Sequence, residues 1–232
     1  MRIANNEISE MEKYLKRIDE DTLNWVQRKS KEVAKLMSYY RCAMMEIETK
    51  LNVLNEEFSW EMDHNPISSI KKRLKSMPSI IGKLERKGHP LSMENIEEHL
   101  MDVAGVRVIC SFPEDVYAMR DALIRQDDVV LLEEKDYIKN SKPNGYRSLH
   151  LIVGIPIFLA KEKKMMKVEV QLRTIAMDFW ASLEHQLRYK KNSDFTMEMA
   201  EELTECARIS ADLDLRMDAI RKSVEKQKHL EP

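Results

Sequence analysis

The sequence is short of the residues that build cross-linked or metal-bound frameworks. Its 232 residues include only three cysteines, Cys42, Cys110 and Cys206, which lie far apart. No C-x-x-C pair and no cluster of Cys and His occurs, so neither a zinc site nor a disulfide framework is expected. Cys110 lies in an apolar strand pattern and Cys206 on an apolar helical stripe. Both are expected to be core thiols in a reducing compartment.

Two further absences concern membranes and nucleic acids. No apolar run approaches the roughly 18–20 residues that a membrane-spanning helix needs, and the N-terminus has no signal-peptide pattern. The formal net charge is −2, so the chain lacks the overall basic field of a typical nucleic-acid binder. We therefore expect a cytoplasmic protein with no membrane contact and no stable nucleic-acid partner.

Glycine is scarce, with five residues, whereas charged residues make up 34% of the chain. This composition is typical of a helix-rich soluble protein. The length suits one domain with helical extensions, or at most two small domains.

Both ends of the chain show helical periodicity. Residues 7–58 contain no Pro or Gly, and their apolar residues recur mostly at three- and four-residue steps, which predicts two helices with a break near residues 28–32. Another long helix is predicted over residues 196–228, with a near-heptad apolar stripe between Met199 and Val224. Packing within the chain is the first interpretation of this stripe, and an oligomer interface is the second.

The middle of the chain alternates between strand and helix patterns. Apolar, β-branched runs predict strands at residues 102–112, 129–132, 149–155 and 166–173. Helices are predicted from residue 114 to 126 and from 175 to 190. The stretch from Pro66 to Pro90, which three prolines punctuate, is expected to hold short helices and loops.

Strands and helices in this order predict an α+β fold around a mixed β-sheet. The expected organisation is a central domain over residues 61–192. A helical extension over residues 1–60 precedes it, and a C-terminal helix over residues 193–232 follows it and serves packing or oligomerisation.

Two segments carry the residues that indicate chemistry. Lys142–His150, reading KPNGYRSLH, places basic residues, a Tyr and a His around an Asn-Gly turn, where the backbone takes positive φ at low cost. Val168–Thr174, reading VEVQLRT, alternates apolar residues with Glu169, Gln171 and Arg173, so these three share one face of a strand. An ordinary half-buried strand gives the same alternation. Together, however, the two segments indicate a nucleotide site in which the tyrosine ring stacks on a base.

These segments, followed by AMDFWASLEH at residues 176–185, resemble the synthetase domain of the RelA/SpoT family. The resemblance runs from about residue 65 to residue 190, and the chain has no room for the further domains of long family members. It therefore looks like a stand-alone small alarmone synthetase with a nucleotidyltransferase-like fold. The resemblance implies transfer of the β,γ-pyrophosphate of ATP to the 3′-hydroxyl of GTP or GDP, which gives AMP and the alarmone pppGpp or ppGpp of the stringent response.

Two carboxylates match the acidic positions of the family's motifs. Asp102 opens the first strand of the middle region, and Glu169 lies inside the last one. Either residue alone is most simply a solvated or salt-bridged acid. Mg²⁺, however, binds proteins through one or two carboxylates together with substrate phosphates. The resemblance implies that Asp102 and Glu169 hold Mg²⁺ and that Glu169 also activates the attacking hydroxyl.

A basic segment matches the family's pattern R-x-K-x-x-x-S-I-x-x-K-x-x-R. Its matching residues are Arg73, Lys75, Ser79, Lys83 and Arg86. Such a run is usually a solvated helix face, but a triphosphate needs several converging cations, because positioning and charge stabilisation dominate phosphoryl transfer. The resemblance implies that the last four residues bind the ATP phosphates. Arg73 and Arg107 would enclose the adenine by guanidinium stacking.

The acceptor nucleotide involves residues around the Asn-Gly turn and beyond. The resemblance implies that Tyr146 stacks on guanine and that the guanosine phosphates are bound by Lys142, with Arg147 and His150 as further candidates. Asp178 is expected to accept the N1–H and the 2-amino group of guanine. Gln171 is expected to line the same pocket.

Other functions remain open on the sequence alone. The same scaffold could pyrophosphorylate another purine nucleotide, or the chain could be a non-catalytic nucleotide- or RNA-binding regulator; only the enzymes would release AMP. The chain contains no His-Asp dipeptide, so the alarmone hydrolase activity of the bifunctional relatives is not expected. The resemblance also implies a homo-oligomer, since small relatives are commonly homotetramers.

Overall fold

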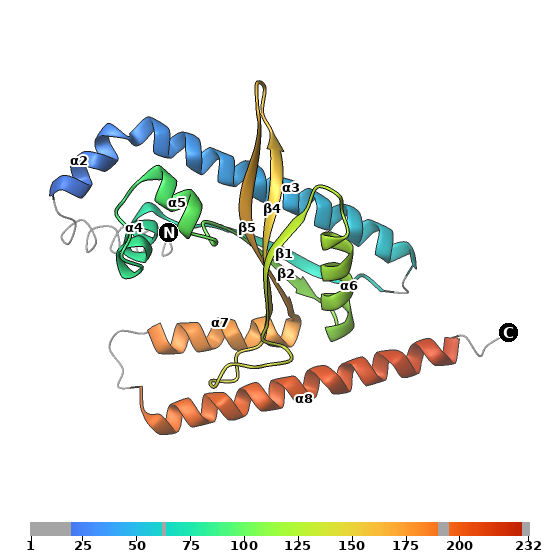
Figure 1. Cartoon of the computed structure of the whole chain (residues 1–232). Helices are drawn as coiled ribbons and strands as arrows, with labels where there is room; N and C mark the ends of the chain where they lie inside the picture. Colours follow the sequence, from blue (N-terminus) through green and yellow to red (C-terminus); the bar gives the residue numbers. More distant parts are fainter. Residues whose placement is uncertain (1–19, 62–63, 190–194, 229–232) are drawn as a thin grey trace, which may run out of the picture.

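A five-stranded mixed sheet forms the centre of the structure, a computed structural model that describes residues 20–61, 64–189 and 195–228 (Figure 1). The strands are β1 (Ile67–Leu74), β2 (Ala104–Cys110), β3 (Val130–Asp136), β4 (Leu149–Phe158) and β5 (Lys163–Thr174). Their order in the sheet is β1-β2-β5-β4-β3. β2 and β5 are parallel, whereas the other neighbours are antiparallel. The predicted α+β fold with a mixed sheet is confirmed.

Helices surround this sheet and extend beyond it. They are α2 (Glu20–Arg28), α3 (Ser30–Glu61), α4 (Met77–Arg86), α5 (Met93–His99), α6 (Pro113–Ile124), α7 (Ile175–Tyr189) and α8 (Met197–Lys228). The break predicted near residues 28–32 is confirmed between α2 and α3. Within the described ranges, no helix is long and apolar enough to cross a membrane.

Helix α3 crosses one face of the sheet (Figure 1) and belongs to the main hydrophobic core. Its side chains Tyr40, Ile47 and Leu51 are at most 1% exposed and pack in the same cluster as the inward-facing side chains of β2, β4 and β5. The apolar half of the VEVQLRT alternation points into this core, as predicted. The polar half is therefore left on the opposite face of the sheet, which α3 does not cover.

The prediction of short helices and loops between Pro66 and Pro90 is right for α4 but wrong for residues 67–74, which form strand β1. Because β1 lies at the edge and pairs only with β2, most of its side chains stay exposed. An edge strand of this kind lacks the period-two apolar pattern by which sequence reasoning detects strands.

The interpretation of the α8 stripe as internal packing is also wrong. Leu213, Met217 and Ile220 are all more than half exposed, and Cys206 is exposed rather than a core thiol. The inward face of α8 uses Ala207 and polar residues instead. Cys110 is fully buried, as predicted.

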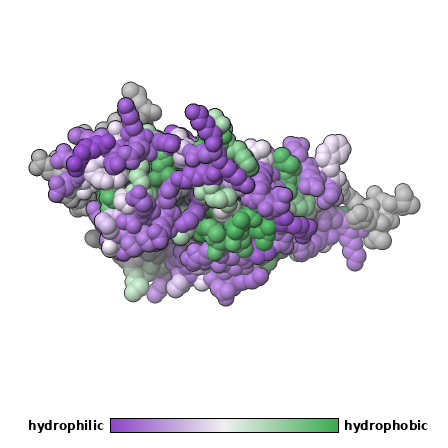
Figure 2. Space-filling model, turned by 45° about the horizontal axis from the view of Figure 1, so that its top comes forward, coloured by the Kyte–Doolittle hydropathy of each residue, from purple (hydrophilic) through white to green (hydrophobic). Residues whose placement is uncertain are grey.

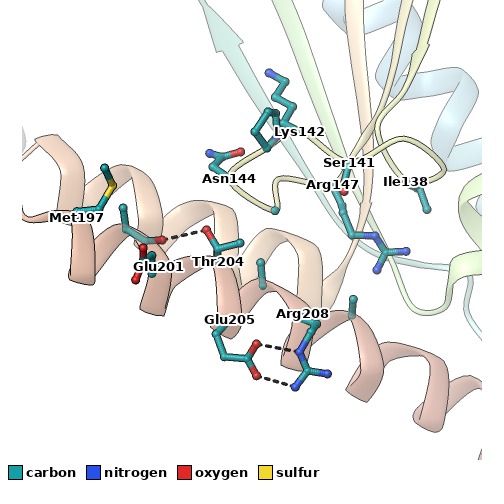
Figure 3. A pocket seen from close by; sticks show the side chains of 15 residues that line it. Ile138, Ser141, Lys142, Asn144, Arg147, Met197, Glu201, Thr204, Glu205 and Arg208 are labelled. Carbon is teal, nitrogen blue, oxygen red and sulfur yellow. Dashed lines mark hydrogen bonds and ion pairs between the residues drawn. The ribbon is translucent and has the colours of Figure 1, made fainter.

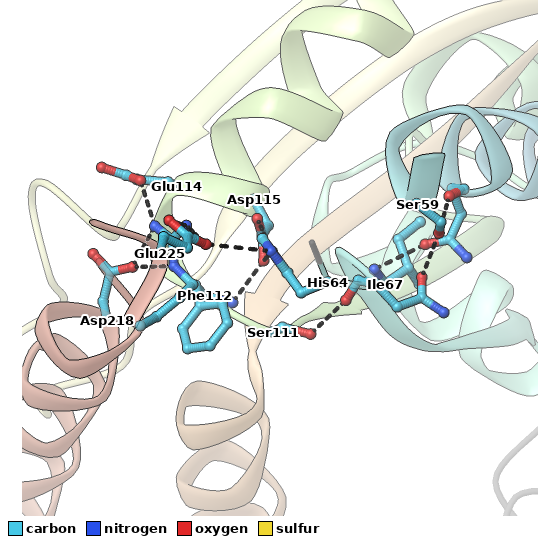
Figure 4. Close-up of polar contacts among 12 residues, drawn as sticks. Ser59, His64, Ile67, Ser111, Phe112, Glu114, Asp115, Asp218 and Glu225 are labelled. Atoms are coloured by element: carbon cyan, nitrogen blue, oxygen red, sulfur yellow. Dashed lines mark hydrogen bonds and ion pairs between the residues drawn. The ribbon is translucent and has the colours of Figure 1, made fainter. Parts of the chain in front are cut away.

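Polar contacts fasten the C-terminal half of α8 to the start of α6 (Figure 4). Arg221 donates hydrogen bonds to Asp218 and Glu225 of its own helix and to Glu114 of α6, at 2.6–3.0 Å. Burial alone would lower the pKa of Arg221, but these three carboxylates outweigh it and raise the pKa above its ordinary value. The contact joins α8 to α6, and α8 also lies alongside α7 (Figure 1).

Candidate functional site

The polar face of the sheet gathers the candidate residues through strand register. The β2–β5 pairing sets Gly105 beside Glu169 and Arg107 beside Gln171. The β4–β5 pairing sets His150 on the other side of Gln171. Residues from strands far apart in the sequence thus form one continuous polar surface, because paired positions point to the same face.

One cleft on this face, the β1–β2 cleft, has a volume of about 380 Å³. Its walls carry the cations Lys71, Arg73, Lys75 and Arg107, together with both candidate carboxylates. Arg73 is exposed on the edge strand, whereas Arg107 is half-buried and its Nε has no hydrogen-bond partner within the described structure. The cleft therefore joins a cationic wall to an acidic floor.

Asp102 is the acidic anchor of the β1–β2 cleft. Its Oδ2 accepts hydrogen bonds from Lys75 Nζ at 2.6 Å and from Lys83 Nζ at 2.7 Å. Burial alone would raise the pKa of Asp102, but the two ammonium groups outweigh burial and lower it. Its Oδ1 is buried with no partner among the described residues.

Helix α4 presents the remaining residues of the basic motif. Ser79 is exposed in its first turn, where helical N–H groups favour an anion. Lys83 and Arg86 are three residues apart in its last turn, so they lie on one side of the helix. The sequence motif thus divides between an edge strand, a connecting loop and a helix.

A second cleft, the β3–β4 cleft, has a volume of about 230 Å³ and contains Tyr137, Lys142 and His150. The Lys142 ammonium lies 4.6 Å from the ring centre of Tyr137 and 4.7 Å from that of Tyr146. Two aromatic rings and a cation therefore converge at the loop between β3 and β4, called here the β3–β4 loop (residues 137–148).

Glu169 lines both clefts. Its Oε2 accepts a hydrogen bond from Gln171 Nε2 at 2.9 Å, and its Oε1 lies 3.4 Å from Nδ1 of His150. Burial would raise the pKa of Glu169, but the contact with His150 and the hydrogen bond from Gln171 outweigh it and lower the pKa below its ordinary value. At neutral pH, Glu169 is an ionised carboxylate between two cavities.

Arg173 links the residues behind these clefts and is only 4% exposed. Its guanidinium donates to Tyr146 Oη at 2.5 Å, to Gln171 Oε1 at 3.2 Å and to Asp178 Oδ1 at 3.3 Å. Since Tyr146 Oη accepts from Arg173, its own hydrogen is available to His150 Nε2, 2.8 Å away. That assignment leaves the His150 proton on Nδ1, which faces Glu169.

Asp178 is surrounded by cations. Lys71 Nζ lies 2.8 Å from its Oδ2, and its Oδ1 also accepts from Arg107 at 3.2 Å. Burial would raise the pKa of Asp178, but Lys71, Arg107 and Arg173 together lower it. The carboxylate is thus engaged with the cationic wall of the β1–β2 cleft.

Eight of the fourteen predicted site residues line these two clefts. Lys83, Tyr146 and Asp178 contact residues that line them, Ser79 and Arg86 lie on α4, and Arg147 lies elsewhere. Its side chain lies on the other side of the β3–β4 loop, where it lines a groove of about 820 Å³ between that loop and α8 (Figure 3). Gln171, predicted beside the acceptor, lines the β1–β2 cleft instead.

Sequence reasoning missed three residues: Lys71, Tyr137 and Arg173. Lys71 was missed because β1 was not recognised as a strand. Arg173 was seen on the polar face, and its position beside Glu169 and Gln171 was the signal that could have assigned it. No sequence signal singled out Tyr137, because only the fold of the β3–β4 loop brings it against Lys142.

The two carboxylates suit a divalent cation of the Mg²⁺ type. Mg²⁺ takes oxygen ligands and typically uses one or two carboxylates, with waters and substrate phosphates as the others. Asp102 offers a buried oxygen without a partner, and Glu169 shares its cleft. No group of three or more ligating side chains occurs among the residues that the structure describes, so any such ion would depend on substrate oxygens.

Comparison with known proteins gives matches over most of the chain. Residues 72–194 match the family described as the region found in RelA/SpoT proteins. The GTP pyrophosphokinase YwaC of Bacillus subtilis is 45% identical over 186 residues, which is 80% of this chain and 89% of that protein.

Solved structures agree with the sequence matches. The crystal structure of small alarmone synthetase 2 from Bacillus subtilis superposes with a TM-score of 0.75 at 43% identity, over 83% of this chain and 99% of that chain. Small alarmone synthetase 1 from the same organism, bound to its product pppGpp, gives a TM-score of 0.75 at 34% identity, over 84% of this chain and 98% of that chain.

Proposed function

Since this chain belongs to the RelA/SpoT family, we propose that its two clefts bind ATP and a guanosine nucleotide and that pyrophosphate passes between them. The chain is a GTP pyrophosphokinase, an alarmone synthetase that makes (p)ppGpp and AMP. One observation carries the assignment of the clefts: Glu169 lines both of them. A group at that position reaches the donor and the acceptor at once.

The β1–β2 cleft is the ATP site in this proposal. Its several cations suit a triphosphate, which needs charge from different elements. Arg73 and Arg107 lie on neighbouring strands, where their guanidinium planes can stack on an adenine. Lys75 and Lys83 converge on Asp102 and would turn to the phosphates when ATP binds.

The β3–β4 cleft is the acceptor site. Lys142 and His150 line this cleft and would supply polar contacts for the guanosine phosphates. Tyr146 contacts both of them at the margin of the cleft and would supply a ring for the guanine base. Tyr137 adds a second aromatic wall. Asp178 is bound by three cations, so recognition of guanine by this carboxylate would require those contacts to be exchanged.

Glu169 is the general base for the 3′-hydroxyl. Its lowered pKa keeps it ionised at neutral pH, and His150, with a proton on Nδ1, would steady the carboxylate as the proton arrives. Asp102 and Glu169 would hold Mg²⁺. Bound there, Mg²⁺ would stabilise charge on the transferred group and lower the pKa of the hydroxyl.

We also propose a homo-oligomer, with a tetramer as the expected form, working in the cytoplasm where ATP and GTP are available. Exposed hydrophobic side chains follow one side of α7 and α8, including Phe179, Leu183, Leu213 and Ile220. Figure 2 shows a largely hydrophilic face with a hydrophobic patch near its middle and smaller hydrophobic areas elsewhere. Surfaces of this kind commonly mark protein interfaces.

The experiment that tests this function is a chromatographic nucleotide assay. Purified protein is incubated with ATP, Mg²⁺ and either GTP or GDP, with EDTA in a parallel sample. We expect equal amounts of AMP and a more strongly retained guanosine product, and none of either with EDTA. AMP formed only with a different purine acceptor would reassign the acceptor cleft. No AMP from folded protein with any acceptor would refute the enzymatic function.

A further inference from the structure

The β3–β4 loop rests on a helix outside the matched family region. That region ends at residue 194, and α8 begins at Met197. In Figure 1 the loop reaches away from the sheet to α8, and Figure 3 shows the two elements facing each other across the groove. The position of Tyr146 therefore depends on an element that makes no direct contribution to the two clefts.

The contact is closest at Gly145, the residue before Tyr146. Gly145 has φ +85°, and a Cβ built on it would lie 2.4 Å from Cβ of Ala207 in α8. No side chain larger than hydrogen fits there, and the positive φ itself favours glycine. Gly145 and Ala207 border both a cavity of about 10 Å³ and the larger groove of about 820 Å³, but the two residues themselves meet without room for another atom.

Tyr146 itself shares this contact. It packs against a small cluster formed by Trp180 and Ala181 of α7 and Ala207 of α8. Trp180 is fixed in turn to α8, because its Nε1 donates to the carbonyl of Leu203 at 2.8 Å. The face of Tyr146 turned away from the β3–β4 cleft is thus supported by both helices.

The residue after Tyr146 also faces α8. Asp214 of α8 is buried and accepts a hydrogen bond from Thr174 Oγ1 at 2.7 Å. Burial raises the pKa of Asp214, while Thr174 and the charge of Arg147 partly oppose that rise. Arg147 also lines the groove beside α8, so both neighbours of Tyr146 in the loop face that helix.

We propose that α8 positions the acceptor loop, with Ala207 beneath Gly145 as the principal positioning residue for Tyr146. This inference rests on the proposed acceptor role of the β3–β4 cleft. Ala207 touches no substrate in this assignment; it sets where the Tyr146 ring stands. Because the described support lies on the acceptor side, disturbing it should weaken use of the acceptor and leave ATP binding largely intact.

The test is the substitution Ala207→Leu in the full chain, with steady-state kinetics for each substrate varied separately. Leucine adds three carbon atoms to a side chain that is only 6% exposed and faces Gly145, so we expect the loop to shift. A displacement of about 1 Å can cost on the order of 10²-fold in rate. We expect the KM for GTP or GDP to rise at least about tenfold and the KM for ATP to change less than about twofold.

A matched control is Ala219→Leu, which makes the same change on an exposed part of α8. It should leave both KM values within about twofold of the unmodified protein. Ala207→Ser, which adds one atom, should raise the acceptor KM less than Ala207→Leu does. If the leucine variant does not fold by circular dichroism, Ala207→Val answers the same question.

Equal increases in both KM values, or an acceptor KM matching that of the Ala219 control, would overturn the proposal. An increase confined to the KM for ATP would also overturn it and would reverse the assignment of the two clefts. Failure of the proposed function is distinguishable, because the unmodified protein would then release no AMP at all.

Discussion

The substitution Glu169→Gln tests the chemistry most directly. It keeps the shape of the side chain and an oxygen that can accept from Gln171, but it removes the charge and the ability to take a proton. Glu169 lies at the boundary of the two clefts with an ionised carboxylate, since His150 and Gln171 overcome the effect of burial on its pKa. The substitution should therefore lower the turnover rate and leave folding largely unchanged.

The expected decrease in kcat follows from the proposed role of Glu169 as a general base. A positioned general base contributes about 10²–10⁴-fold to a rate, so we expect kcat to fall about 10³-fold, or roughly 4 kcal/mol at 1.36 kcal/mol per decade. The pKa of Glu169 is lower in the folded protein than in the unfolded chain, so the ionised side chain stabilises the fold. This stabilisation is fully present above the ordinary Glu pKa of about 4.3 and is lost as the pH falls through the folded pKa. The variant should thus lose less than about 1 kcal/mol of stability at neutral pH.

The assay is AMP release with ATP and GDP at saturating concentrations, together with urea unfolding of the same preparations. Glu57→Gln, on an exposed part of α3, is the control and should retain full turnover. A Glu169→Gln protein with near-normal kcat would refute the assignment of the base. A drop of several kcal/mol in unfolding free energy would show that Glu169 serves the fold instead.

Three further predictions concern the surrounding contacts. Lys83→Met removes one of the two cations on Asp102, so the KM for ATP should rise about 10–100-fold, as expected for a charged contact of about 1.5–3 kcal/mol; an unchanged KM would exclude Lys83 from the ATP site. In Arg173→Lys, the ammonium group cannot reproduce the planar set of hydrogen bonds that the guanidinium makes. Calorimetric titration with GDP should therefore show an affinity at least about tenfold lower. An unchanged affinity would contradict the role of Arg173 in supporting Tyr146. Arg221→Ala removes one of the two cations on the buried Asp218, which keeps Lys222, and should lower the urea unfolding free energy by about 1.5–3 kcal/mol, whereas a change below about 0.5 kcal/mol would show that this contact does not hold α8.

The central strands were predictable because their patterns depend on burial alone. Val168, Val170 and Leu172 are fully buried in one cluster, so their alternation with polar residues marks β5 without tertiary information. Strand β1 could not be found in this way, because its place at the sheet edge leaves five of its eight side chains exposed. Edge strands are defined by the neighbour with which they pair, and that neighbour is distant in sequence.

The candidate site was likewise only partly predictable from the sequence. Asp102, Glu169 and Tyr146 stand in motifs that could be read directly from the sequence, and the structure brings them to the two clefts or their margin. Arg147 lies in the same motif as Tyr146 but faces α8, since adjacent residues of a loop point in different directions. Sequence spacing gives the residue types, whereas the direction of each side chain depends on the fold.

Helix α3 sets a boundary for anyone who wishes to move this activity into another protein. The region shared with the family starts at residue 72, but α3 ends at Glu61 and contributes fully buried side chains to the core. A segment cut at the border of the family region would lose one wall of its own interior and expose a hydrophobic sheet to solvent. The transplantable unit is therefore longer than the family region, and a graft that omits α3 should aggregate before it makes product.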